Sequence, residues 1–405
     1  MRTSPLTRRG LLAGAAALAL AGCGSNTGRN RPPGITQWYH AYGEDGVQQA
    51  VQRYAADYRR TPVTVRWIPG DYDSKLASGL LSGVGPDVFE ATLQVDMIRS
   101  GQVADLTDII EPHRADFAPA VLSGFEFGGR LYGVPQTVDA QFLFYRKSML
   151  QEAGVRPPET LPELVDAAGR LTGGRRKGLF LGNNAGSDVL GGPLLWSVGL
   201  DFVSEDHKQP GFAEPEVGPA VAAIRDMFAR GHLLLGAPTD WSSPAAITQG
   251  LCAMQWGGLW IVPELRKTLG DDFGILPWPP LTAKPSVPIG AFGSMISPKT
   301  HVLAEAKDYV RWLWLDRTDL QADFTNSYGL HIPARQQITP NPVAAEASSL
   351  VNRFGRVAFP VALTAKMRVS YRDALTRIIR AGADPRRELQ SAAEPVRAEL
   401  RRLFG

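Results

Sequence analysis

The segment from Ile35 to Glu90 alternates short apolar runs with amphipathic ones, and this alternation is the strongest constraint on the fold. Apolar runs at Ile35–Tyr39, Val63–Ile68 and Pro86–Glu90 predict three strands. Between them, Gly46–Arg59 and Tyr72–Leu81 carry apolar residues at helical spacing. This β-α-β-α-β order implies a parallel sheet with helices on both faces, which places ligand sites beyond the carboxyl ends of its strands.

The rest of the chain continues the α/β pattern. Its 405 residues, 44% of them hydrophobic, are too many for one ordinary core and suit two lobes. Four further helices and one strand are expected, at Thr160–Leu171, Pro219–Ala229, His301–Leu315 and Val369–Ala381 and at Leu251–Trp256.

The first residues of the chain predict export. Arg8 and Arg9 precede the apolar run Leu11–Leu20, which leads into Leu20-Ala21-Gly22-Cys23. Residues 1–22 therefore read as a signal peptide, whose apolar run is about half of the ~20 residues that span a bilayer. The last four residues resemble a bacterial lipobox, in which Cys23 would be diacylated. The paired arginines resemble a twin-arginine signal, and the choice between that route and the general secretory route stays open.

Residues 23–33 predict a lipidated, flexible tether, since 24–34 contain no apolar residue able to pack. The net charge of +3 equals the contribution of Arg2, Arg8 and Arg9 in the signal, so the mature chain is near neutrality. Such a chain lacks the clustered basic excess of a nucleic-acid binder.

Recognisable catalytic patterns do not occur. There is no Gly-x-Ser-x-Gly elbow and no His-Glu-x-x-His, and none of the six histidines has metal-ligand spacing, so no metal or cofactor is expected. Cys252 lies in an apolar strand without a basic neighbour and is expected to be a buried, unpaired thiol. An enzyme using Cys252, or a carboxylate pair drawn from Glu44, Glu90 and Asp139, is the alternative reading.

Loops rich in aromatic and short polar residues follow several expected strands. Examples are the segments 38–45, 136–141, 183–188 and 257–260. Aromatic faces stack on the C–H faces of sugars, and carboxylate or amide groups bond hydroxyls, so these loops suit a small polar ligand in a concave site.

Several motifs, in order along the chain, resemble the bacterial extracellular solute-binding proteins of family 1, the sugar-type receptors of ATP-binding-cassette importers. Gly101–Asp108 and Gly129–Pro135 are close to the family's "gly-x-leu-x-asp-leu-thr" and "gly-lys-leu-tyr-gly-val-pro" segments. Phe144–Gly154 is similar to its "tyr-tyr-asn-lys" segment, with Arg146 in place of the Asn. Gly250–Trp260 and Tyr328–Arg335 resemble the later "ala-met … gly-x-trp" and "gly-x-x-pro" segments.

The resemblance implies an α/β, two-lobed periplasmic-binding-protein fold of type II-like topology, with a cleft between the lobes. Matching positions place the first lobe at 34–141 plus 285–338 and the second at 142–284 plus 339–405. The same matching, together with the aromatic and polar loops, gives the expected ligand-binding residues: Tyr42, Glu44, Glu90, Thr92, Thr137, Asp139, Asn183, Asp188, Gly258, Trp260, Phe292, His331 and Arg335.

The implied function is capture of a small polyhydroxylated solute and its delivery to the permease subunits of an importer. The protein would be a monomer, held on the outer face of the cell membrane by its lipid, without chemistry, cofactor or nucleic acid. A sugar, an amino sugar and a glycerophosphate-type ester remain open as ligands, and Arg335 would pair the phosphate of the last.

Overall fold

A computed structural model of the chain describes residues 33–42, 44–82, 85–328, 331–358 and 360–405. The predicted signal peptide, the lipidation site at Cys23 and the tether up to residue 32 lie outside the described residues. No helix among the described residues is long and apolar enough to cross a membrane.

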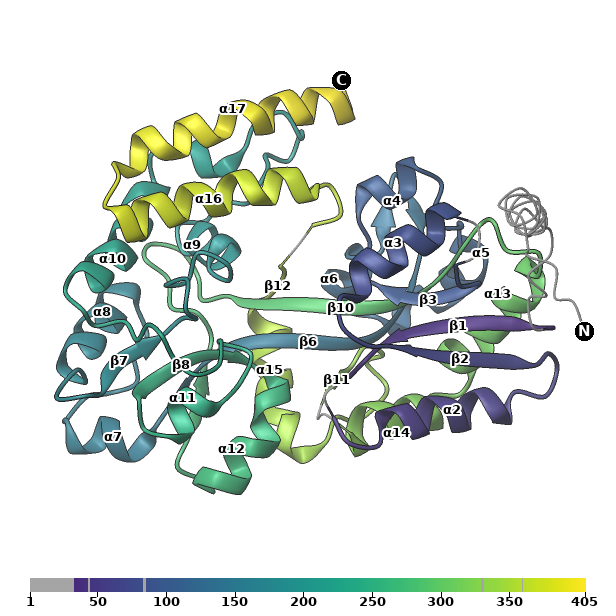
Figure 1. The fold of residues 1–405 in the computed structure, drawn as a ribbon, viewed down its shortest axis with the longest axis horizontal. Helices are drawn as coiled ribbons and strands as arrows, with labels where there is room; N and C mark the ends of the chain where they lie inside the picture. The colour runs from purple at the N-terminus through teal and green to yellow at the C-terminus, as the bar shows by residue number, and fades with distance from the viewer. Residues whose placement is uncertain (1–32, 43, 83–84, 329–330, 359) are drawn as a thin grey trace, which may run out of the picture.

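The first lobe begins as the sequence predicts. The strands β1 (Ile35–His40), β2 (Val63–Ile68) and β3 (Val88–Ala91) alternate with the helices α2 (Val47–Asp57) and α3 (Tyr72–Ser82). Strand β1 lies between the other two and is parallel to both, which confirms the predicted parallel β-α-β-α-β unit. The carboxyl ends of these strands therefore point toward the middle of the molecule (Figure 1).

Two long strands join the halves of the molecule. The strands β6 (Val134–Tyr145) and β10 (Val287–Ile296) run side by side through its centre (Figure 1). Strand β10 pairs antiparallel with β3 and with the first half of β6, while the second half of β6 pairs with β8 (Cys252–Gly258). One strand thus belongs to the sheets of both lobes.

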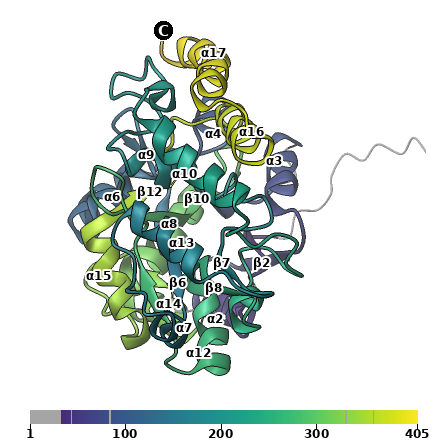
Figure 2. The ribbon, with the colours of Figure 1, turned by 90° about the vertical axis from the view of Figure 1, so that its left-hand side faces the viewer.

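The second lobe is built on β8 and its parallel neighbour β7 (Lys177–Phe180). Helix α8 (Leu161–Arg170) begins with a capping box, in which Thr160 and Glu163 each bond the other's backbone N–H. Figure 2 views this lobe end-on, with α16 (Ala365–Ala381) and α17 (Pro385–Phe404) at the top and α7 (Lys147–Glu152) and α12 (Val262–Leu269) at the bottom. Its larger helices are α8 (Leu161–Arg170), α10 (Val217–Ala229), α12 (Val262–Leu269), α16 (Ala365–Ala381) and α17 (Pro385–Phe404).

Shorter helices and strands connect the elements described above. They are α4 (Val95–Arg99), α5 (Thr107–Ile110), α6 (Pro119–Ser123), β4 (Glu126–Phe127), β5 (Arg130–Leu131), α7 (Lys147–Glu152), α9 (Gly191–Trp196), α11 (Ala245–Thr248), β9 (Gly274–Leu276), α13 (Leu303–Arg311), α14 (Thr318–Ser327), β11 (Ile332–Pro333), α15 (Ala345–Phe354) and β12 (Gly355–Val357).

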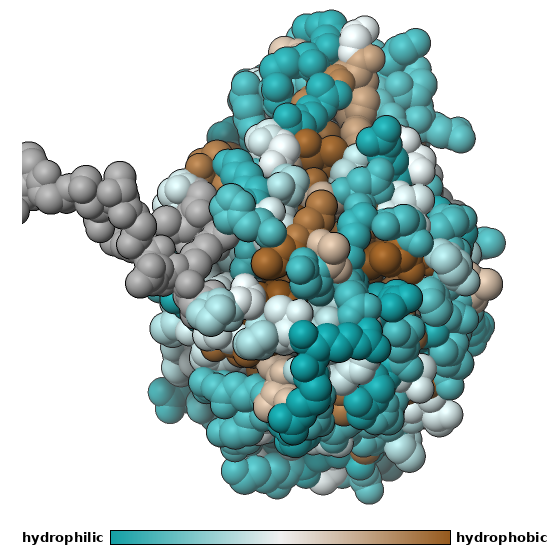
Figure 3. All heavy atoms as spheres, turned by 90° about the vertical axis from the view of Figure 1, so that its right-hand side faces the viewer, coloured by the Kyte–Doolittle hydropathy of each residue, from teal (hydrophilic) through white to brown (hydrophobic). Residues whose placement is uncertain are grey.

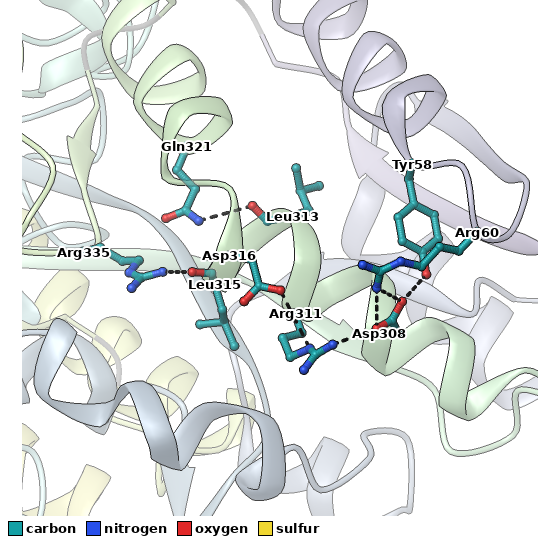
Figure 4. A network of polar contacts seen from close by, with 9 residues as sticks. All are labelled: Tyr58, Arg60, Asp308, Arg311, Leu313, Leu315, Asp316, Gln321 and Arg335. Carbon is teal, nitrogen blue, oxygen red and sulfur yellow. Dashed lines mark hydrogen bonds and ion pairs between the residues drawn. The ribbon is translucent and has the colours of Figure 1, made fainter.

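The helix expected over His301–Leu315 is shorter than predicted. Helix α13 ends at Arg311, and the chain continues as a π-helix over Trp312–Asp316. The wider turn changes the backbone hydrogen-bonding pattern, and two of its carbonyls bind side chains. Gln321 donates to the Leu313 carbonyl at 3.2 Å, and Arg335 donates to the Leu315 carbonyl (Figure 4).

Most large apolar side chains pack into cores on either side of the central strands. The face at the right-hand side of Figure 1 is mostly hydrophilic, with apolar side chains confined to small patches (Figure 3). Cys252 is fully buried and, among the described residues, is a free cysteine. The expected buried, unpaired thiol is thus confirmed, and its burial raises the pKa of the thiol far above the ordinary value.

We predict that Cys252 reacts with a thiol reagent only after unfolding, because neither solvent nor a cation stabilises its thiolate. The measurement is the labelling rate in a Cys23→Ala background, in which Cys252 is the remaining thiol. Labelling of the native protein as fast as that of the denatured protein would contradict this assignment.

Candidate functional site

A cleft between the lobes holds a pocket of about 250 Å³. Thr92 and Phe125 line it from the first lobe, and Trp260 lines it from the second. Asp139 and Gln141 on β6 and Phe292 on β10 complete this wall from the strands that join the lobes. The expected residues Thr92, Asp139, Trp260 and Phe292 therefore meet in one cavity.

A second pocket, of about 410 Å³, shares the lining residues Gln141 and Ala358 with the first. Asp188 and Trp241 line this second pocket. The walls of the two pockets combine indoles with a few polar groups, as small-molecule sites do.

Strand alternation aims Asp139 at the cleft. Asp139 and Gln141 line the pocket, whereas Val138, Ala140 and Phe142 pack into the core on the other face of β6. The Asp139 side chain is 22% exposed, so it remains open to a ligand while its charge lies partly out of water.

A buried imidazole stands behind Asp139. Ile332 pairs with Val138, which brings His331 beside Asp139, and His331 Nδ1 lies 2.7 Å from Asp139 Oδ1. His331 Nε2 lies 3.4 Å from Glu44 Oε1, an ion-pair contact without hydrogen-bond geometry. Burial alone would lower the pKa of His331, but the two carboxylates raise it to about 10. The ring is therefore an imidazolium at neutral pH, and it holds one Asp139 oxygen in place.

A second network supports the neighbouring wall. Glu90 is 1% exposed and accepts hydrogen bonds from the His40 backbone N–H at 2.8 Å and the Tyr42 hydroxyl at 2.7 Å. The His40 ring lies 2.5 Å from the same carboxylate and stacks on Phe292, with ring centroids 4.7 Å apart. Burial lowers the pKa of His40, but Glu90 and then Asp139 and Glu44 raise it above the ordinary value.

The Trp260 indole is oriented by one hydrogen bond and by contact with a second indole. Its Nε1–H donates to the Ser242 carbonyl at 2.9 Å, and its ring meets Trp241 at 67° with centroids 5.6 Å apart. A Cβ on Gly258 would lie 1.9 Å from the Trp260 ring, although the backbone of Gly258 is extended. Gly258 therefore makes room for the indole, while the residues lining the pocket do not include it.

Other expected residues lie behind the cleft. Thr137 is 1% exposed and pairs with Phe292 in the strand register. Asn183 bonds both backbone groups of Ala237, at 3.0 and 3.3 Å, and is absent from the pocket linings, whereas its neighbour Asp188 lines the second pocket.

Arg335 lies away from the cleft. It is 3% exposed and pairs with Asp116 and the Leu315 carbonyl, toward which it points in Figure 4. Its guanidinium also lies 5.9 Å from the Phe117 ring centroid. The resemblance of the late Pro loop placed Arg335 near the site, but its long side chain extends between residues 116–117 and the π-helix.

Sequence reasoning missed Gln141, Phe125 and Trp241, which line the two pockets, and His40, which stacks on Phe292. His40 and Gln141 belong to segments noted for their composition, but they end up in strands β1 and β6, where the strand register sets their side-chain directions. Phe125 and Trp241 are aromatic but belong to no motif that indicates a ligand site. A lone aromatic residue suits core packing as well as it suits ligand binding.

Among the described residues, no group of His, Cys, Asp or Glu side chains is arranged to hold a metal ion. The residues that line the two pockets offer carboxylates, an amide group and indole faces, which are groups that recognise hydroxyl-bearing ligands.

The sequence model of the bacterial extracellular solute-binding proteins matches residues 42–316. The chain belongs to this family. The match confirms the family expected from the motifs and places the protein among exported binding proteins.

Curated relatives are distant. An arabinooligosaccharide-binding protein of Bacillus subtilis is 27% identical over 153 residues, which cover 35% of each chain. A binding protein of Brucella abortus is 24% identical over 336 residues, which cover 80% of each chain.

Solved structures share the two-lobed fold. A solute-binding protein of Thermotoga lettingae bound to tagatose superposes with a TM-score of 0.76 at 19% identity, covering 90% of this chain and 99% of that one. The acarbose-binding GacH receptor of Streptomyces glaucescens gives 0.76 at 20% identity, covering 91% and 98%. The maltotriose-binding protein of Thermus thermophilus gives 0.72 at 21% identity, covering 92% and 100%.

The buried imidazolium predicts a pH dependence. Because the folded-state pKa of His331 is raised from 6.5 to about 10, its stabilisation is complete below pH 6.5 and is lost as pH rises toward 10. The free energy of unfolding should fall by up to about 1.4 kcal/mol per pH unit in this window relative to His331→Gln. Urea unfolding across the window measures this slope.

His301→Gln, at an exposed histidine, is the matched control and should follow the wild type. Parallel slopes for wild type and His331→Gln would show that His331 is not charged in the folded protein.

Proposed function

We propose that the protein is an extracytoplasmic lipoprotein that binds a carbohydrate in its cleft and delivers it to the permease of an ATP-binding-cassette importer. The observation that carries this is the position of Asp139 and Trp260 on the walls of one interlobe pocket in a chain of this family. The named sugars of the similar structures and of the Bacillus subtilis relative support the ligand class.

Binding would proceed by closure of the lobes on the ligand. Asp139 would accept hydroxyl hydrogen bonds, each worth about 1.5–3 kcal/mol for a charged acceptor. Trp260 would stack on the apolar face of a sugar ring. A ligand that contacts both lobes stabilises the closed state over the open one, because those contacts form together only when the lobes are closed.

The charge around Asp139 favours a neutral or amino sugar over a glycerophosphate-type ester. Asp139, Glu44 and Glu90 face two histidines, so around Asp139 the carboxylates outnumber the cations even when both rings are charged. The second pocket differs, because Arg368 and Arg372 line it together with Asp188. Arg335, the residue proposed to hold a phosphate, is committed to Asp116. A phosphate at Asp139 would meet a carboxylate rather than a guanidinium.

We infer that the protein does no chemistry. Cys252, the nucleophile of the alternative hydrolase or transferase, is buried and has a raised thiol pKa, and no observation favours it as a catalytic group. Histidines hold the Asp139 carboxylate of the cleft and the buried Glu90 carboxylate, as suits fixed acceptors.

We further propose that the lobes comprise residues 34–141 plus 285–338 and 142–284 plus 339–405. The change of partner along β6 supports the first boundary, since Ala140 pairs with β10 and Gln141 with β8.

Export would leave the protein anchored by a lipid on Cys23, at the outer face of the membrane. Cys23→Ala should release the protein from the membrane fraction or leave its signal uncleaved, because the thiol is the site of acylation. Fractionation with metabolic lipid labelling measures this, and unchanged label in the variant would contradict the anchor.

A thermal-shift panel tests the ligand class. Arabino-, malto- and manno-oligosaccharides, a glucosamine disaccharide and a glycerol phosphodiester are compared, because a ligand of the native state raises the melting temperature. At least one sugar should raise it and the phosphodiester should not.

For the sugar that binds, calorimetry should show affinity at least tenfold lower in Asp139→Ala and in Trp260→Ala, a loss of about 1.4 kcal/mol or more. Asp319→Ala and Trp312→Ala, outside the cleft, are matched controls. Wild-type affinity in both cleft variants, or no response to any sugar, would contradict the proposal.

A further inference from the structure

Residues 237–243, here called the tryptophan loop, pass beside Trp260 without belonging to a strand or helix. The loop supplies the Ser242 carbonyl that accepts the Trp260 indole N–H at 2.9 Å. It also supplies Trp241, whose ring packs against that of Trp260. The orientation of Trp260 therefore depends on a segment with no regular backbone pairing of its own.

Three side chains hold the tryptophan loop. The Asn183 amide bonds the Ala237 backbone as a neighbouring strand would, accepting from its N–H at 3.0 Å and donating to its carbonyl at 3.3 Å. Asp240 accepts from the Asn183 and Trp241 backbone N–H groups at 2.9 and 2.8 Å. The fully buried Gln255 of β8 donates to the Ser243 carbonyl at 2.7 Å.

Gly182, the residue before Asn183, makes room for the Trp241 ring. Gly182 has φ +91°, which an L side chain rarely adopts, and a Cβ there would lie 3.3 Å from Trp241 Cδ1. Trp241 is thus packed between Gly182 and Trp260. The segment 182–183 supports one end of the tryptophan loop and one face of its indole.

We infer that Asn183 is a positioning residue, which fixes the tryptophan loop so that Ser242 and Trp241 hold the Trp260 ring at the cleft. This inference rests on the proposed function, in which Trp260 stacks on the sugar. It changes the expected role of Asn183 from a ligand contact to a residue that holds the tryptophan loop. Orientation of this kind matters because a binding group that is ordered beforehand loses less entropy when ligand binds.

Circular dichroism of the mature chain tests the inference without a ligand. Two indoles at 5.6 Å couple their excited states and give paired bands of opposite sign, and the difference between wild type and Trp241→Phe isolates this pair. The buried pair Trp256–Trp278, also 5.6 Å apart, contributes to every spectrum and serves as the internal reference.

Asn183→Leu, close in volume but without the amide, should reduce the Trp241–Trp260 signal at least twofold while the Trp256–Trp278 contribution persists. Asn183→Asp keeps the acceptor for Ala237 and should retain an intermediate signal. Gly258→Ala, which displaces the Trp260 ring directly, should match Asn183→Leu. The matched control is Asn184→Leu, because the Asn184 side chain bonds Asp188 and not the tryptophan loop. This variant should keep the wild-type signal.

Indole N–H exchange measured by NMR gives an independent readout. The Trp260 indole proton should exchange at least tenfold faster in Asn183→Leu, because Ser242 no longer holds it. A wild-type signal and exchange rate in Asn183→Leu would overturn the inference, as would equal losses in Asn184→Leu. Failure of the sugar panel would overturn the proposed function and leave these spectra unchanged.

Discussion

The antiparallel pair β6–β10 is the constraint on which the site depends. Because both strands run through the centre of the molecule, the cleft floor is made of regular backbone, and strand alternation fixes which side chains face it. Asp139 and Gln141 face the ligand side, while Val138 and Ala140 anchor the same strand in the core. The register shifts between Phe292 and Gly293, and Gly293, which has no Cβ, leaves space for the Phe125 ring that lines the pocket.

The two walls are held in different ways. In the first lobe, histidines fix a partly exposed carboxylate and a buried one: His331 holds Asp139, and His40 and Tyr42 hold the buried Glu90. Such pairs are strong where water is scarce, and they keep acceptors in place before ligand arrives. In the second lobe, the Trp260 indole is positioned by backbone, through Ser242 and the space at Gly258. The cleft thus combines a charged, rigid acceptor wall with an apolar stacking wall.

The sequence predicted the local elements well and the long-range ones less well. The period-2 run of β2 and the helical spacing of α2 are local properties, so both were predicted to within a few residues. The antiparallel joining of β10 to β3 and β6 depends on segments far apart in the chain, and no local pattern reveals it.

The same division applies to the site. Asp139 and Trp260 follow short motifs at fixed spacing, and both line the cleft. Arg335 and Asn183 also lie in suitable loops, but their side chains satisfy Asp116 and Ala237, which are distant in sequence. Loop composition identifies residues near a site, whereas the partner of each polar group is decided by the folded chain.

A crystal structure of the protein with a sugar that raises its melting temperature tests the position of the site most directly. We expect the lobes closed on the sugar, one ring stacked on Trp260 and a hydroxyl bonded to the Asp139 oxygen that His331 leaves open. A sugar bound elsewhere, such as the groove lined by Phe127, Glu205 and Phe404, would contradict it.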